Sequence, residues 1–438
     1  MPSLIEPKLR VAICGGGIGG LMLACALSRA QDIALDVYEG AAAFGDIGAG
    51  ITLRKRTMPF LADLGLIDEI TAINGSSGNT SGTGMTFYRA DNGELETITD
   101  IPGQGMVTLH RAEFHNIIFR HIASHVRMHT TKRLISYTDP GDVNSPVRLV
   151  FADGTDATCD ILIGADGVKS AVRATMLNEL ASRMDDEIEA EELRESIPPR
   201  FSGASTLRAV IPKEKLAAIS SDSSVWTAGN LYSGNGLAFV TYPISQGRLL
   251  NVAVMTFNYA LEDSLYPQPW VLSTKTDELT PLVEGWAPEI RHVVACLDGV
   301  EVKKWVINVV RPLADWTVGR VALLGDAAHA MTPFQGAGAV QAIEDAQVLS
   351  KLLAHPCTTR ATVQQALRVY TDVRRPVARK FFDASRRNGQ LISDPTILPH
   401  ECGAEMTRVM DEVWNRLDSP AMNAQRAADL FEQALRDV

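Results

Sequence analysis

The chain has 438 residues, which is too long for a single compact hydrophobic core and predicts two or three domains. A net charge of −11, with lysines and arginines scattered along the chain, argues against a nucleic-acid partner and against a basic tail for an anionic membrane. Six widely spaced cysteines form no zinc-binding pattern, and neither a signal segment nor an apolar run of membrane-spanning length is present. We therefore expect a cytoplasmic monomer or homodimer that holds no metal and does not bind a membrane.

The first part of the chain predicts a βαβ unit. The apolar segment Arg10–Cys14 predicts a strand, a glycine-rich turn and an apolar helix follow, and a second strand ends at Glu39. A glycine-rich loop then precedes an amphipathic helix that is interrupted at Gly65. Residues 73–105 predict loops and short strands, and residues 109–122 predict another helix.

The middle of the chain changes from α/β to β character. Asp153-Gly154 predicts a hairpin turn, and the following apolar strand ends at Gly164. The acidic segment 184–200 ends in two prolines and predicts a solvated connector that could be mobile. Short strands at 201–308 predict a mostly antiparallel sheet. After 308 the strand–turn–helix pattern returns, and the last ninety residues predict helices.

The fold class is therefore α/β with an inserted β domain. We predict a discontinuous Rossmann-like domain, a mostly antiparallel β-sheet domain and a C-terminal helical region. The predicted boundaries are 1–75, 105–183 and 309–360 for the Rossmann-like domain, 76–104 and 200–308 for the β-sheet domain, and 361–438 for the helical region.

The first chemical motif is the spacing Gly15-x-Gly17-x-x-Gly20 between a strand and a helix. Its glycines allow a tight turn and a close approach to a pyrophosphate, which then faces the N-terminus of the helix. Glu39 ends the next strand, where an acidic side chain can bind a ribose hydroxyl. The motif predicts dinucleotide binding, but it does not distinguish NAD from FAD.

Two later motifs also end buried strands. "GADG" places Asp166 after an apolar strand, although an Asp-Gly pair alone can be a simple turn. "GDAAHAMTPFQGAGAVQAIEDA" places Asp326 where a carboxylate could hold a polyol hydroxyl. Its small residues Gly336–Ala339 then open a helix, whose free N–H groups suit an anionic group.

Together and in this order, the three motifs resemble the single-component FAD-dependent aromatic hydroxylases, in particular salicylate hydroxylase and its fungal relatives. The resemblance covers about residues 9–390 and makes the Rossmann-like domain an FAD-binding domain. It implies that FAD is held by the glycine-rich turn, Glu39, the loop up to Gly50, one helical arginine, two aspartates and the late helix. These residues are Gly15, Gly17, Ile18, Gly19, Gly20, Glu39, Ala49, Gly50, Arg111, Asp166, Asp326, Gly338 and Ala339. From its position alone, Arg111 would be read as a surface residue.

The resemblance also implies a reaction. NADH or NADPH binds transiently and reduces the flavin, O2 adds to it, and a flavin C4a-hydroperoxide hydroxylates a small phenolic ring. A salicylate-like or hydroxybenzoate-like acid is the expected substrate, with or without loss of CO2. The alternative is a related FAD monooxygenase that hydroxylates or epoxidises a larger secondary metabolite.

The catalytic candidates are Arg208, Tyr242 and Pro333. In related fungal enzymes an arginine and a tyrosine at matching positions stabilise and orient a phenolate, and Pro333 would face the substrate. Arg208 could instead point away from the sheet, and Tyr242 could be a core aromatic residue. A histidine that many members use as the phenol base is replaced by Ala238, which leaves the base unassigned. His329 is interpreted as structural.

Overall fold

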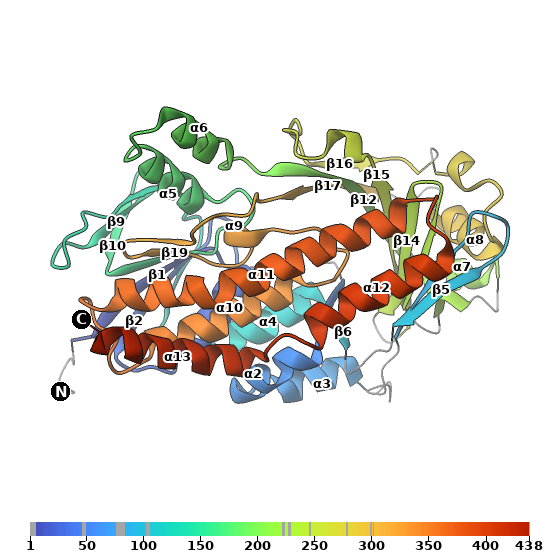
Figure 1. The fold of residues 1–438 in the computed structure, drawn as a ribbon. Coiled ribbons are helices and arrows are strands. Elements are labelled where there is room, and N and C mark those ends of the chain that lie inside the picture. The colour runs from blue at the N-terminus through green and yellow to red at the C-terminus, as the bar shows by residue number, and fades with distance from the viewer. Residues whose placement is uncertain are drawn as a thin grey trace.

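The computed structural model contains two main β-sheets. Figure 1 shows them toward opposite ends of the molecule, with long C-terminal helices running across both. The structure describes residues 6–45, 50–75, 84–101, 106–220, 224–226, 229–244, 247–276, 279–297, 300 and 302–437.

The first sheet has six strands and carries the expected βαβ opening. Its strand order is β18-β19-β11-β1-β2-β7, and all neighbours are parallel except β18 and β19. The strands are Thr317–Val318 (β18), Val321–Leu323 (β19), Ile161–Gly164 (β11), Leu9–Cys14 (β1), Ile33–Tyr38 (β2) and Arg127–His129 (β7). The central strands are buried on both faces, which is why they read as continuous apolar runs.

The second sheet has eight strands and is mostly antiparallel, as expected from the insert. Its order is β16-β17-β12-β15-β14-β13-β4-β5, and only β13 and β4 run parallel. The strands are Val271–Thr274 (β16), Val302–Val309 (β17), Arg200–Pro212 (β12), Leu249–Phe257 (β15), Leu237–Ile244 (β14), Gly229–Gly234 (β13), Met85–Arg89 (β4) and Glu96–Ile101 (β5). Strands β4 and β5, which lie before residue 105 in the sequence, therefore join the same sheet as the strands between residues 200 and 309.

Two smaller sheets complete the β structure. Gly50–Leu53 (β3) pairs with Val107–His110 (β6). Leu134–Thr138 (β8), Val147–Phe151 (β9) and Asp156–Cys159 (β10) form an antiparallel sheet. The turn between β9 and β10 has a positive φ at Gly154, which confirms the predicted hairpin.

The helices surround the first sheet and pack on both faces of the second. They are Ile18–Leu27 (α1), Met58–Asp63 (α2), Ile67–Gly75 (α3), Arg111–Arg120 (α4), Ala171–Ala181 (α5), Glu187–Glu195 (α6), Lys213–Ala217 (α7), Pro288–Leu297 (α8), Asp326–His329 (α9), Gly338–Leu353 (α10), Val363–Ser393 (α11), Pro399–Trp414 (α12) and Pro420–Arg436 (α13). On the second sheet, α7 and α8 lie on one face and α11 and α12 on the other. Gly65 interrupts the predicted amphipathic helix, and it separates α2 from α3 with a φ of 70°.

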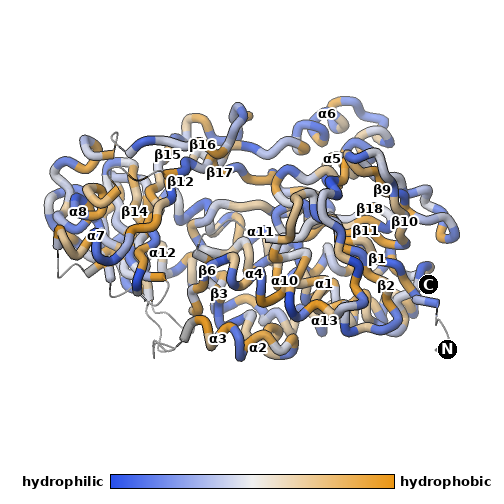
Figure 2. Tube along the Cα trace, turned by 180° about the vertical axis from the view of Figure 1, so that it is seen from behind, coloured by the Kyte–Doolittle hydropathy of each residue, from blue (hydrophilic) through white to orange (hydrophobic). Residues whose placement is uncertain are grey.

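The acidic segment 184–200 differs from the prediction of a solvated connector, because residues Glu187–Glu195 form helix α6. The Asp186 side chain accepts hydrogen bonds from the N–H groups of Ile188 and Glu189 and so caps the helix. Ala190 is fully buried and Leu193 packs against the core. Figure 2 shows α6 as a largely hydrophilic segment, which is why its short apolar face gave a weak signal.

The C-terminal helices contact both sheet regions. Helix α13 packs along α10 beside the first sheet, whereas α12 lies against β5 of the second sheet. A Cβ at Gly403 of α12 would clash with the carbonyl oxygen of Ile98, which shows how closely α12 approaches β5. The predicted residue boundaries of the three domains stay a prediction.

Candidate active site

The glycine-rich turn leaves an open space at the N-terminus of α1. Gly15 has a φ of 118°, and a Cβ there would clash with the carbonyl of Ala165. By contrast, a Cβ at Gly17 would meet no atom within 4 Å. The first intrahelical bond runs from Leu21 N to Gly17 O at 2.9 Å, so the N–H groups from Ile18 to Gly20 have no acceptor within the helix. This arrangement can receive a pyrophosphate.

Glu39 and His115 fix this turn from two sides. The Glu39 carboxylate accepts hydrogen bonds from Gly16 N at 2.8 Å and from Ala41 N at 2.7 Å. His115 of α4 is buried, and its Nε2 lies 2.7 Å from Gly16 O. Sequence reasoning missed His115, since a histidine inside an amphipathic helix carries no special signal.

The late motif lies directly beside this turn. A Cβ at Gly19 would clash with Leu324, the residue that follows β19, and would come within 3.1 Å of the Ala342 Cβ of α10. Gly19 therefore lets α1 pack closely against α10. The two predicted halves of the cofactor site are neighbours in space even though about three hundred residues separate them in sequence.

Asp166 is partly buried and caps α5. Its carboxylate accepts hydrogen bonds from Ser170 Oγ at 2.5 Å and from Ala171 N at 2.7 Å. Burial raises the pKa of Asp166, although these hydrogen bonds oppose the shift. A structural role for Asp166 is thus visible, and the predicted contact with the cofactor remains a prediction.

Arg173 connects the Asp166 loop to the Asp326 segment. It is buried and donates to Ala327 O at 2.8 Å and to Val168 O at 2.5 Å. Burial lowers the pKa of Arg173 to about 10, while the nearby Asp166 and Asp326 raise it. Asp326 itself is exposed at the start of α9, so its carboxylate can reach a ligand.

Helix α10 begins at Gly338, as the small-residue motif predicted. Its first intrahelical bond runs from Gln341 N to Ala337 O at 2.8 Å. The N–H groups of Gly338 and Ala339 consequently have no acceptor within the helix. The positive end of the helix dipole lies at the same place, which suits a group that carries negative charge.

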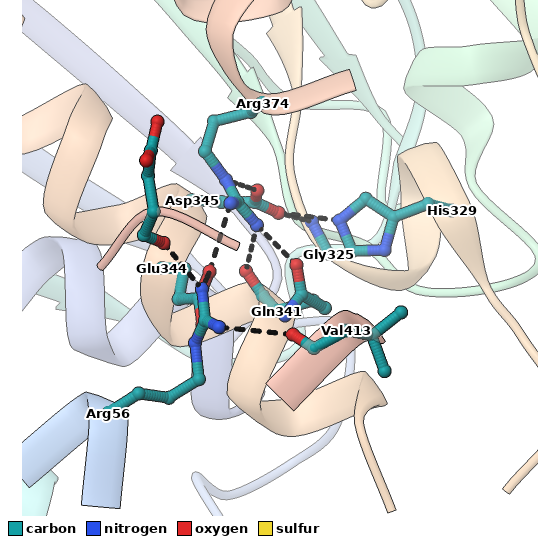
Figure 3. A network of polar contacts seen from close by, with 9 residues as sticks. Arg56, Gly325, His329, Gln341, Glu344, Asp345, Arg374 and Val413 are labelled. Carbon is teal, nitrogen blue, oxygen red and sulfur yellow. Dashed lines mark hydrogen bonds and ion pairs between the residues drawn. The ribbon is translucent and has the colours of Figure 1, made fainter. Parts of the chain in front are cut away.

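A buried network of charged side chains holds the base of this segment, as Figure 3 shows. Asp345 of α10 accepts hydrogen bonds from His329 Nε2 at 2.6 Å and from Gly325 N at 3.1 Å, which supports the interpretation of His329 as structural. Arg374 of α11 binds Asp345 at 2.8 Å and Glu344 at 3.0 Å. Arg56 Nε donates to the other carboxylate oxygen of Glu344, Oε1, at 2.6 Å. The turn that presents Asp326 is therefore locked to α10 and α11.

Arg208 and Tyr242 lie together on the face of the second sheet that is turned toward β3. The Tyr242 hydroxyl occupies the space where a Cβ of Gly50 would lie. Burial lowers the pKa of Arg208, the neighbouring Tyr242 raises it and the nearby Arg111 lowers it further. Burial raises the pKa of Tyr242 against the effect of Arg208. At neutral pH the pair is a guanidinium cation and a neutral hydroxyl.

Pro333 and Phe334 are partly buried and are held from behind by α11. Thr332 and Ser385 exchange two hydrogen bonds, at 2.9 Å and 2.6 Å, and Asn388 Nδ2 donates to Phe334 O at 3.4 Å. Phe334 also packs on Phe257 of the second sheet, with 5.5 Å between the ring centroids. Of the predicted site residues, only Ala49 lies outside the described part of the chain.

Comparison with known proteins explains this arrangement. The FAD binding domain family matches residues 8–202 and 280–385, which is well over half of the chain. The chain is also 33% identical to the FAD-dependent monooxygenase str9 of Strobilurus tenacellus, over 98% of this chain and 99% of that protein. The chain belongs to the FAD-dependent monooxygenases.

Two further similarities make the relationship more specific. This monooxygenase is 30% identical to a salicylate hydroxylase of Pseudomonas putida, over 95% of each chain. A solved structure of a salicylate hydroxylase substrate complex superposes with a TM-score of 0.81 and 28% identity, over 96% of this chain and 98% of that one. The resemblance to salicylate hydroxylase and its fungal relatives, the α/β fold class and FAD as cofactor are thereby confirmed.

Two other features of the monooxygenase bear on its partners. No helix in the described part of the chain is long and apolar enough to cross a bilayer. Within the same residues, no cluster of three or more histidine, cysteine, aspartate or glutamate side chains is arranged to hold a metal ion.

Proposed function

We propose that this monooxygenase hydroxylates a small phenolic carboxylic acid, with FAD as cofactor and with NADH or NADPH and O2 as co-substrates. The observation that carries the proposal is the pairing of the Arg208 cation with the neutral Tyr242 hydroxyl beside Gly50. The names of several relatives support the substrate class, since they include salicylate hydroxylase, 6-methylsalicylate 1-monooxygenase and 3-amino-4-hydroxybenzoate 2-monooxygenase.

The residues present fit FAD. The open space at Gly17 and the unpaired N–H groups of α1 suit the pyrophosphate, and Glu39 lies at the same turn for the adenosine ribose. Exposed Asp326 suits the ribityl hydroxyls, and the first residues of α10 suit the pyrimidine edge of the ring. When bound, FAD supplies hydride acceptance from NAD(P)H and the activation of O2.

Arg208 and Tyr242 bind and orient the substrate. The guanidinium of Arg208 pairs with the carboxylate or with the phenolate oxygen, which favours the ionised ring. Tyr242 donates its hydroxyl proton in a hydrogen bond to the same oxygen, because its raised pKa keeps it protonated. Ala238 cannot act as a base and Tyr242 is itself protonated, so we propose that the substrate binds with its phenol already ionised.

Pro333 and Phe334 exclude water from the reacting ring. Their backbone is anchored to α11 through Ser385 and Asn388, so this wall of the pocket has a rigid support. A dry site limits the loss of activated oxygen as hydrogen peroxide. One atom of O2 then enters the substrate and the other leaves as water, with NAD(P)H as the source of electrons.

The test is a screen of hydroxybenzoates and alkyl salicylates with the purified flavoprotein. We expect one or more of them to accelerate NADH or NADPH oxidation and to give a product heavier by one oxygen or, if CO2 is also lost, a lighter product that has gained one oxygen and lost CO2. Hydrogen peroxide is measured in parallel to separate coupled from uncoupled turnover. The proposal is wrong if no phenolic acid accelerates oxidation while the protein retains FAD.

A larger secondary metabolite is the second candidate. It is favoured by the small buried Ala238 on the strand that carries Tyr242. Acceleration of NAD(P)H oxidation by a larger alkylated phenol or an alkene, with hydroxylation or epoxidation as the outcome and no response to simple acids, would select this candidate.

We also propose a cytoplasmic location and a monomeric or homodimeric state. All six cysteines are free and five of them are buried, which agrees with a reducing compartment. Sedimentation analysis of the FAD-loaded protein distinguishes monomer from dimer.

A further inference from the structure

Arg54 is an unassigned cation at the end of β3. Its backbone is extended, with φ −112° and ψ 151°, so it continues the alternation of the strand. Its side chain therefore lies on the same face of β3 as the Thr52 side chain. This is the face on which Gly50 meets Tyr242. Arg54 also contacts the late motif, since its Nη2 lies 3.5 Å from Gln335 O.

Arg54 has no carboxylate partner among the described residues. Its Nε is buried without an acceptor there, and its guanidinium lies over the ring of Trp414 at 4.4 Å from the centroid. Burial lowers the pKa of Arg54 to about 10, and no neighbouring charge contributes to the shift. The group is still a cation at neutral pH, and a buried cation without an anion is costly.

Gln335 adds a second donor at the same place. Its Oε1 accepts a hydrogen bond from Trp414 Nε1 at 2.8 Å, which orients the amide. Its Nε2 is then buried without an acceptor in the described structure. Gln335 lies three residues before the start of α10, whose first N–H groups are also unpaired. Buried donors are rarely left unpaired because losing their hydrogen bonds to water is costly, so a cluster of unpaired donors indicates an acceptor that binds there.

We propose that Arg54 and Gln335 bind the pyrimidine edge of FAD and stabilise the negative charge of the reduced flavin. This inference rests on the proposed function, which places the pyrimidine edge of the ring at the first residues of α10. Arg54 supplies a full positive charge where the helix end supplies a partial one, and both lie in a desolvated environment that strengthens electrostatic interactions. The oxidised ring is neutral, so Arg54 favours the reduced form selectively.

The test is the midpoint potential of bound FAD, measured by dye equilibration without any substrate. In Arg54→Met we expect the preference of the site for reduced over oxidised FAD to fall at least tenfold, which lowers the potential by about 30 mV for a two-electron couple. Arg54→Lys should retain most of the wild-type potential. Lys55→Met removes an equal charge from the exposed neighbouring residue and should leave the potential unchanged.

Gln335→Glu provides a second measurement if Arg54→Met does not fold, because a new carboxylate would neutralise Arg54 and also lower the potential. FAD-loaded variants with the wild-type potential would overturn the inference, even if their melting temperatures fell, since Arg54 would then only pack against Trp414. Loss of FAD binding by the wild-type protein would be a different result, which would remove the proposed position of the cofactor instead.

Discussion

Gly50 and Tyr242 meet with no side chain between them, so the loop after the βαβ unit and the β-sheet insert share one contact point. Tyr242 reaches this point because residues 238, 240 and 242 alternate onto the same face of β14. Arg208 lies two strands away in the same sheet, where β15 separates β12 from β14. The proposed roles of Arg208 and Tyr242 would thus let two side chains of the second sheet act on a substrate ring beside Gly50.

For Arg208→Met we expect kcat/KM for an acidic phenol to fall about 10- to 150-fold, as the loss of a charge-assisted hydrogen bond of about 1.5–3 kcal/mol implies. Tyr242→Phe should have a smaller effect, because a neutral hydrogen bond is weaker. FAD content and melting temperature are measured alongside. Lys304→Met on neighbouring β17 is the control and should leave kcat/KM unchanged. An unchanged kcat/KM in Arg208→Met would exclude its proposed role.

Helices α10 and α11 are joined by buried charges rather than by apolar packing alone. Asp345 and Arg374 are fully buried, and each binds several partners. Burial by itself would raise the pKa of Asp345, but His329 and Arg374 outweigh it and hold the pKa below its usual 3.8. A carboxyl with a lowered pKa stabilises the fold above its unfolded pKa of about 3.9, and this contribution is lost as the pH falls through the lower folded value.

Asp345→Asn should therefore lower the free energy of unfolding by about 3–5 kcal/mol at pH 7, because Arg374 is left buried with one anion fewer. The wild-type protein should lose stability more steeply than the variant as the pH falls below about 4. Thermal unfolding at a series of pH values measures both effects. Asp383→Asn, on an exposed turn of α11, is the matched control. Equal acid sensitivity of the wild type and Asp345→Asn would contradict this explanation.

At the scale of the whole molecule, α12 fastens the second sheet to the C-terminal helices. Gly403 allows α12 to approach the Ile98 carbonyl of β5, and Trp414 at the other end of the helix contacts Arg54 beside β3. One helix thus spans from β5, the outer strand of the second sheet, to Arg54 at the end of β3.

Gly403→Ala should destabilise this contact by about 1–3 kcal/mol, as overpacking does in a close interface. Hydrogen exchange should accelerate in β5 and α12, while β1 and β11 keep their protection. The neighbouring Ala404 is exposed, so Ala404→Val adds volume without a clash and serves as the control. Equal acceleration of exchange in both sheets would contradict this prediction, because the effect of Gly403→Ala would then not be confined to α12 and β5.

The parts that the sequence predicts well have local signals. Gly15, Gly17 and Gly20 follow a strand within one βαβ unit, and Gly338 opens its own helix, so short patterns predict both. The network around Asp345 could not be predicted, because its ion pairs join residues from 16 to 288 positions apart and depend on tertiary packing. Helix α6 was missed because its acidic composition resembles a solvated connector, while its Asp186 cap and the packing of Ala190 and Leu193 decide the structure.

The packing of α1 against α10 has a consequence for the order in which the protein is made. Helix α1 is apolar on nearly every face. Seven of its first eight residues are buried in the finished protein, and Gly19 is the exception. One of its covering surfaces is α10, and β11 gains its outer neighbour only when β19 has been synthesised. A nascent chain therefore carries an incompletely covered apolar helix for about three hundred residues of synthesis and the open edge of β11 for about 160. Both features favour aggregation or chaperone binding. The proposed roles of Asp326, Gly338 and Ala339 in FAD binding predict that FAD is captured late, after the ribosome has completed this segment.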